Sequence, residues 1–188
     1  MHMTRLVCLF SLLILIGYSS FSQNFLSTSG KSIVNEVGDT IILRGMGLGG
    51  WMVQEGYMMA PGGFSSTQYQ IRDKLTELIG PQETDIFYDN WLSNHVRKID
   101  IDSMKQWGFN LVRAPIHYNL FTEPIQNEPY PFAYTEKEKG FQLLDSLLSW
   151  CKQNEIYLMI DLHAAPGGQG YNADISDYDP SKPSLWES

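Results

Sequence analysis

The sequence has 188 residues, of which 43% are hydrophobic, enough for one domain with a buried core. Its formal net charge is −8 at pH 7, and so negative a protein repels the phosphates of nucleic acids and anionic lipids. Neutral ligands, sugars among them, meet no such repulsion. The composition therefore excludes nucleic-acid binding and leaves neutral substrates open.

The first residues predict a secretory signal peptide. Arg5 gives a positive start, residues 6–17 form an apolar run, and small residues bracket a cut after Ser22. A membrane span is the alternative, but the run is shorter than the ~20 apolar residues that cross a bilayer. We therefore expect residues 1–22 to be removed. Residues 23–188 would then be secreted, to the periplasm, cell surface or medium, with no membrane association.

Next in the chain, residues 32–43 predict a β-hairpin that turns at Gly38-Asp39. The glycine-rich segment 43–51 lacks the spacing of a phosphate-binding loop, so we interpret its glycines as a tight turn at a strand end. Helical periodicity and apolar runs then predict three helices between 71 and 107, a strand at 109–116, a helix near 141–151 with Thr135 as its cap, and a strand at 156–163.

Cysteine usage agrees with a stable core. Cys8 lies in the predicted signal, so the exported chain retains Cys151 alone and forms no intramolecular disulfide. Cys151 shares a helical stripe with Phe141, Leu144 and Leu148. We therefore interpret it as a small core residue and not as a nucleophile.

Alternating strands and helices predict βαβ units with a parallel sheet. The two later strands are continuously apolar, which is typical of strands covered on both faces. A sheet of three parallel strands with two open edges is incomplete. We therefore expect only about the first three β/α units of a larger fold.

In parallel α/β barrels, functional side chains lie where strands end and loops begin. Candidates follow each of the three predicted strands: Trp51 and Glu55, then Arg113, His117 and Tyr118, then Asp161 and His163. Further on, the acidic residues Asp174, Asp177 and Asp179 do not fit a calcium loop, and we interpret them as a solvated loop.

Several of these candidates also have a structural interpretation. Arg113, inside an apolar strand, forms either an ion pair with Asp161 or a cationic partner for a catalytic carboxylate. Trp51 is either a core residue or a stacking platform for a pyranose ring. His163 is a core residue, a substrate donor or, with His117, a metal ligand. No metal-binding motif occurs in the sequence, which disfavours the metal alternative.

Three motifs, LRGMGLGGWMVQE (43–55), WGFNLVRAPIHY (107–118) and IDLHAAPGGQ (160–169), together resemble glycoside hydrolase family 5. The resemblance is strongest to its cellulase and exo-β-1,3-glucanase-like members, because the motifs occur in that order and spacing. It implies a (β/α)8 TIM barrel and retaining hydrolysis of a β-1,4 or β-1,3 glucan, without a cofactor. We expect the full-length protein to be a monomer.

The resemblance also implies roles for single residues. Arg113 matches a strand-end arginine that pairs with the nucleophile, and His163 matches a histidine that hydrogen-bonds the sugar at the point of cleavage. Glu55 matches an acidic residue that binds substrate hydroxyls. His117 and Tyr118 occupy a less uniform family position and are further candidates for substrate binding.

The sequence departs from the family after the third strand, where Gln169-Gly170-Tyr171 replaces a frequent Gln-Asn-Gly and leaves the linkage and the endo or exo action open. Retaining glycosidases need an acid/base and a nucleophile ~5–5.5 Å apart. The family carries both after later strands, which we expect beyond Ser188. Asn127-Glu128-Pro129 spells the acid/base motif in the wrong place, so we interpret it as coincidental.

The sequence thus predicts the binding half of an active site, inactive by itself. The alternative is a non-catalytic carbohydrate-binding protein on a decayed barrel.

Overall fold

The computed structural model describes residues 25–181 except 61–62, 132 and 172. The predicted signal peptide, residues 1–22, therefore lies outside the described residues. The chain divides into two compact units, Met1–Ile42 and Leu43–Ser188. Within the described ranges, no helix is both long and apolar enough to cross a membrane.

The first unit holds two short antiparallel strands, β1 (Ser27–Ser29) and β2 (Ser32–Val34). The hairpin predicted for residues 32–43 differs from this pairing. Across Gly38 there is only an isolated bridge between Val34 and Thr40. The side chain of Asn35 accepts hydrogen bonds from the backbone N–H groups of Val37 and Asp39, and this local turn competes with a longer ladder.

The second unit contains a parallel sheet in the order β3–β4–β5, formed by β3 (Gly45–Gly47), β4 (Leu111–His117) and β5 (Tyr157–Ala164). Arg113 is paired with Gly47 on one side and with Met159 on the other. The parallel order confirms the predicted βαβ arrangement.

Helices and 3-10 turns lie between and after these strands: α2 (Gly56–Met59), α3 (Gln68–Ile79), α4 (Pro81–Asn94), α5 (Lys98–Gln106), η1 (Tyr118–Leu120), η2 (Ile125–Asn127), α6 (Glu138–Gln153) and α7 (Ala173–Ser176). The four longer helices, α3 to α6, confirm the helices predicted from the periodicity of the sequence. Gly80, with φ of 84°, and Pro81 at the first position of α4 separate α3 from α4. The predicted cap of α6 is wrong, because Thr135 donates to Glu128 and Lys137 occupies the cap position.

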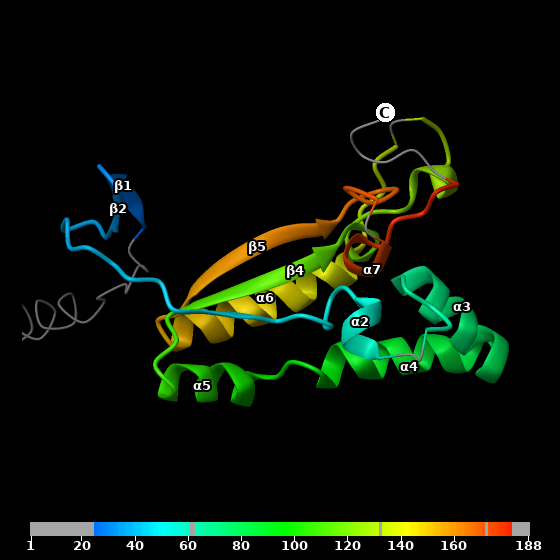
Figure 1. Ribbon diagram of the computed structural model, residues 1–188, viewed down its shortest axis with the longest axis horizontal. Coiled ribbons are helices and arrows are strands. Elements are labelled where there is room, and N and C mark those ends of the chain that lie inside the picture. Colours follow the sequence, from blue (N-terminus) through cyan, green and yellow to red (C-terminus); the bar gives the residue numbers. More distant parts are fainter. Residues whose placement is uncertain (1–24, 61–62, 132, 172, 182–188) are drawn as a thin grey trace, which may run out of the picture. The chain divides into compact units, whose positions relative to one another are not determined.

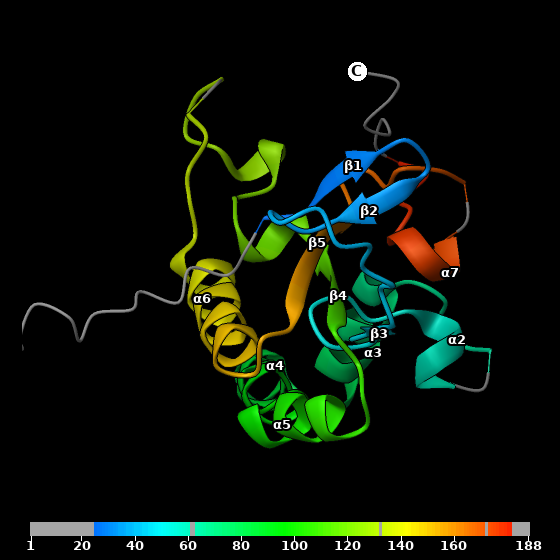
Figure 2. The ribbon, with the colours of Figure 1, turned by 90° about the vertical axis from the view of Figure 1, so that its left-hand side faces the viewer.

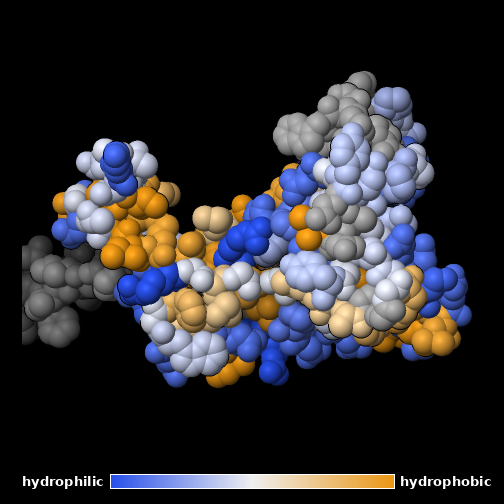
Figure 3. Space-filling view, viewed as in Figure 1, coloured by the Kyte–Doolittle hydropathy of each residue, from blue (hydrophilic) through white to orange (hydrophobic). Residues whose placement is uncertain are grey.

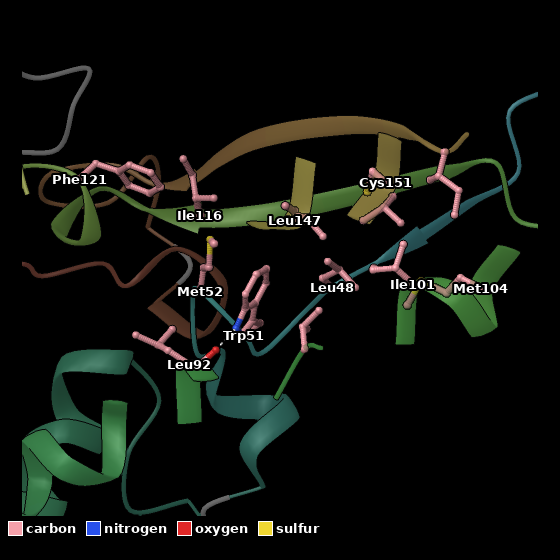
Figure 4. Packing of buried hydrophobic residues seen from close by; sticks show 14 residues of the cluster. Leu48, Trp51, Met52, Leu92, Ile101, Met104, Ile116, Phe121, Leu147 and Cys151 are labelled. Carbon is pink, nitrogen blue, oxygen red and sulfur yellow. Dashed lines mark hydrogen bonds between the residues drawn. The ribbon is translucent and has the colours of Figure 1, made fainter. Parts of the chain in front are cut away.

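The hydrophobic core of this unit lies between the sheet and the helices α4, α5 and α6 on one side of the strands (Figures 1 and 2). Alternate residues of β4 point into it, as the period of two in a strand requires. Figure 4 shows the packing, which includes Leu48, Trp51, Met52, Leu92, Ile101, Met104, Val112, Ala114, Ile116, Leu147 and Cys151. On α6, Leu147 and Cys151 are fully buried, whereas Phe141 and Leu148 of the predicted stripe are about half exposed.

Strand β5 is less covered than its sequence predicts. Met159, Ile160 and Leu162 are exposed by 46%, 55% and 47%, and hydrophobic surface is visible along this strand in Figure 3. Successive residues of a strand point to opposite faces, so both faces of β5 carry exposed apolar side chains. The predicted burial of β5 on both faces is therefore wrong for the part of the chain that the structure describes.

Candidate active site

Polar side chains from separate segments form a continuous chain of contacts at the carboxyl end of the sheet. Arg113 of β4 donates to Asp161 of β5 through Nη2, and this nitrogen also lies 3.2 Å from Nδ1 of His163. Nδ1 of His163 is 3.0 Å from Asp161 Oδ2, and Nε2 is 3.1 Å from Glu55 Oε1. Tyr57 donates to the other Glu55 oxygen over 3.4 Å. The three segments predicted to carry chemistry are thus brought together.

Strand geometry explains this convergence. Asp161 and His163 are two residues apart on β5 and therefore point to the same face. Arg113 is paired with Met159, which lies two residues before Asp161 on β5. Arg113 therefore points to the same face as Asp161 and His163. Glu55 directly precedes α2, and its side chain reaches His163 from there. The face opposite to the core is therefore the polar one.

Burial makes these contacts energetically important. Glu55 is only 5% exposed, and a buried carboxylate is costly unless it is hydrogen-bonded. Desolvation, and then the Glu55 carboxylate, raise the pKa of Tyr57 above its ordinary value, so this phenol stays protonated and can donate. The Arg113 side chain is 42% exposed despite its ion pair with Asp161. The structural ion pair is present, and the guanidinium also remains accessible.

A cavity of about 240 Å³ opens beside this cluster, lined by Gly47, Gly49, Glu55, Tyr57, Met58, Arg113, His163 and Ile175. A larger cavity of about 470 Å³ lies on the outer side of α3, between Phe64 and apolar residues of the helix. Its charged groups, Lys74 and Glu77, pair with each other three residues apart on the helix. Converging polar groups mark the smaller cavity as the candidate site.

A second buried polar cluster lies at the end of β4. His117 is 2% exposed, and its Nε2 is 2.7 Å from Asp177 Oδ2. The other Asp177 oxygen accepts the backbone N–H of Tyr69 over 3.0 Å. Nδ1 of His117 accepts the N–H of Asn119, and its ring stacks on Tyr118 with centroids 5.0 Å apart. The interpretation of Asp177 as solvated is wrong, since its side chain is 10% exposed and bonded on both oxygens.

The family model for cellulase (glycosyl hydrolase family 5) matches residues 68–186. The chain belongs to glycosyl hydrolase family 5. Beta-xylosidase of Phanerodontia chrysosporium is 34% identical over 145 residues, covering 77% of this chain and 29% of that protein. Glucan 1,3-beta-glucosidase 2 of Saccharomyces cerevisiae is 32% identical over 155 residues, covering 70% of this chain and 26% of that protein. The chain thus spans under a third of the length of these relatives.

Solved structures agree at the level of the fold. The crystal structure of rutinosidase from Aspergillus niger superimposes with a TM-score of 0.52 at 20% identity, covering 71% of this chain and 36% of that one. The α/β arrangement with a parallel sheet is therefore that of the TIM-barrel glycoside hydrolases. The family assignment made from the three motifs is confirmed.

In this family 5 chain Trp51 is a core residue. Its side chain is 2% exposed, and its indole N–H donates to the backbone oxygen of Leu92 over 2.8 Å (Figure 4). A ring enclosed in this way offers no face to a sugar, which corrects the expectation of a stacking platform. The aromatic residue that lines the cavity is Tyr57, which is 59% exposed. Its position in the sequence, two residues after the candidate Glu55, could have indicated that Tyr57 lies at the same site.

Neither Glu128 nor a metal ion gains a catalytic role from the geometry. Glu128 accepts the N–H and the hydroxyl of Thr135 over 2.8 and 2.7 Å and so closes an exposed loop. In the part of the chain that the structure describes, no group of three or more His, Cys, Asp or Glu side chains could hold a metal ion. His117 and His163 have different hydrogen-bond partners, so the alternative of a metal site made from both gains no support.

Proposed function

We propose that this chain forms the amino-terminal part of a retaining glycoside hydrolase that cleaves a β-1,3 or β-1,4 glucan. The observation that carries the proposal is the chain of contacts from Arg113 through Asp161 and His163 to Glu55, beside a cavity at the carboxyl end of a parallel sheet. Membership of family 5 supports hydrolysis of glycosidic bonds. Relatives named glucan 1,3-beta-glucosidase support the choice of a β-glucan.

Sugar hydroxyls are at once donors and acceptors, and the cluster presents groups of both kinds. In the proposed complex His163 and Glu55 bind neighbouring hydroxyls of the sugar whose bond is broken. Tyr57 covers that ring from the open side of the cavity. Arg113 pairs with the nucleophilic carboxylate, keeping it ionised and oriented, because a guanidinium beside a carboxylate favours the charged form.

The two catalytic carboxylates belong, in this proposal, to later strands of the same barrel. The half-exposed apolar residues of β5 support this, because every strand in a closed barrel has two neighbours and a covered face. The acid/base and the nucleophile would stand ~5–5.5 Å apart, as retention requires. The full-length protein would be an exported monomer, directed by residues 1–22 to a polysaccharide outside the cytoplasm.

Kinetics of the complete gene product test the proposal, with laminarin and carboxymethylcellulose as substrates. His163→Ala removes a group that contacts the sugar and should lower kcat/KM by about 100-fold. The matched control is His95→Ala, since His95 is exposed and its ring packs at a tilt against Trp91, away from the cavity lining. No hydrolysis of either glucan by the parent, or equal losses in the two variants, would contradict the proposal.

A further inference from the structure

The buried cluster at the end of β4 joins three segments that lie far apart in the sequence. Asp177 accepts from His117, which ends β4, and from the N–H of Tyr69, in the first turn of α3. One carboxylate therefore links a strand end, a helix start and the segment that follows α7. We call the trio His117, Asp177 and Tyr69 the β4–α3 staple.

The hydrogen bonds fix the tautomer of His117. Nδ1 accepts the backbone N–H of Asn119 over 3.2 Å, so it carries no proton. The ring proton is therefore on Nε2, which donates to Asp177 over 2.7 Å. Both groups facing the carboxylate, the Nε2–H of His117 and the N–H of Tyr69, are donors. They bond different oxygens of Asp177, so both positions at the end of this side chain have to be acceptors.

The staple is connected to the candidate active site through α7. Asp177 directly follows this helix, and Ile175 of α7 lines the cavity together with Arg113 and His163. Figure 1 shows α7 beside the carboxyl end of β5, which it contacts. Asp177 itself adopts a φ of 52°, a conformation that costs free energy and persists only where contacts hold it.

Two further contacts hold the loop that follows β5. A side chain at Gly168 would place its Cβ 2.8 Å from the Cα of Tyr178, so the two backbones touch there. Gln169 donates through its side chain to the backbone oxygen of His163. The loop after β5 thus folds back so that its far end, at Asp177, is fixed by the staple, while its near end is fixed at His163.

We propose that His117 and Asp177 are positioning residues that hold α7 as a wall of the sugar-binding cavity. Neither residue lines the cavity, so both act through Ile175 and the backbone around it. This inference rests on the proposed function, because the cavity has to bind sugar for its wall to matter. It predicts that breaking the staple weakens sugar binding and leaves the chemical step nearly unchanged.

The decisive variant is Asp177→Asn in the complete gene product. In asparagine an NH2 group replaces one of the two carboxylate oxygens, so one of the two donors meets another donor. We expect the Tyr69 amide to exchange its hydrogen about tenfold faster, and KM for laminarin-derived oligosaccharides to rise about tenfold, with kcat within about twofold of the parent. Asp179→Asn is the matched control, since it removes the same charge from the same loop at a side chain that bonds to Ser181.

A pair of substitutions at His117 decides the point independently, should Asp177→Asn not fold. His117→Gln retains a side-chain N–H that can reach Asp177 and should keep KM near that of the parent. His117→Leu has no donor and should behave as Asp177→Asn. The inference would be overturned if Asp177→Asn kept the parental exchange rate of the Tyr69 amide and the parental KM. It would also be overturned if His117→Gln and His117→Leu had equal KM. A parent without hydrolysis would refute the proposed function, and the exchange rates would then decide whether the staple exists.

Discussion

Trp51 and Tyr57 lie close together in the sequence and differ sharply in exposure, at 2% and 59%. Both are large aromatic residues next to glycines, so a neighbouring glycine alone does not separate core from cavity. The difference arises from α4, whose Leu92 accepts the indole N–H of Trp51. That partner is distant in the sequence, which is why the sequence left both a core role and a sugar-stacking role open for Trp51.

The assignment of Trp51 to the core gives a prediction with an internal control. Trp51→Phe removes one buried hydrogen bond and leaves unfilled volume, so the free energy of unfolding should fall by about 1–3 kcal/mol. KM for glucan should not change. Trp107→Phe, at a side chain that is 70% exposed, should alter stability by less than about 0.5 kcal/mol. Urea unfolding of both variants checks the first claim, and a raised KM in Trp51→Phe would contradict the second.

Cys151 gives a prediction about reactivity. Its side chain is fully buried on α6, and burial raises the pKa of the thiol to about 11 from its ordinary value of 9.0. A higher pKa means less thiolate at any given pH below it, so labelling by a thiol reagent near pH 8 should be roughly 100-fold slower than in the unfolded chain. The same protein in denaturant is the control. Equal labelling rates would show that the thiol is accessible.

At the scale of elements, the helices could be predicted from local periodicity, and the parallel sheet from the alternation of strands and helices. The polar residues at the ends of the strands could be predicted too, because parallel strands bring their carboxyl ends to one edge. The pairing of His117 with Asp177 could not, because it depends on how a loop folds back over β5. The prediction that Thr135 caps α6 was wrong for a similar reason, because the Thr135 side chain bonds to Glu128 instead.

Helix α2 carries a prediction about how Glu55 and Tyr57 are held. Gly56 lies between them, and a Cβ there would come within 2.2 Å of the backbone oxygen of Ser66, which has little freedom to move. Gly56→Ala should therefore destabilise the fold by about 1–3 kcal/mol and weaken sugar binding, because α2 has to shift. Gly170→Ala is the control, since its Cβ would meet nothing within 4 Å. Parental stability and KM in Gly56→Ala would refute this packing.

At the scale of the whole molecule, the chain presents an α/β unit whose polar edge has cationic and imidazole groups but, in our account, no catalytic pair. The 188-residue chain alone should therefore show no glucan hydrolysis, and Glu128→Gln should not change the rate of the complete gene product. Reducing-sugar assays on both proteins test this. Turnover by the short chain that disappears on changing Glu128 would return that residue to the mechanism.

The stereochemistry of the reaction tests whether Arg113 orients a nucleophile for retaining hydrolysis. Proton NMR, recorded while the complete gene product hydrolyses a β-glucan oligosaccharide, identifies the anomer released first, before mutarotation mixes the two forms. We expect the β-anomer. A nucleophile oriented by Arg113 forms a glycosyl-enzyme, and water then attacks it from the face that the leaving group occupied. Initial release of the α-anomer would show direct displacement by water and would contradict the role proposed for Arg113.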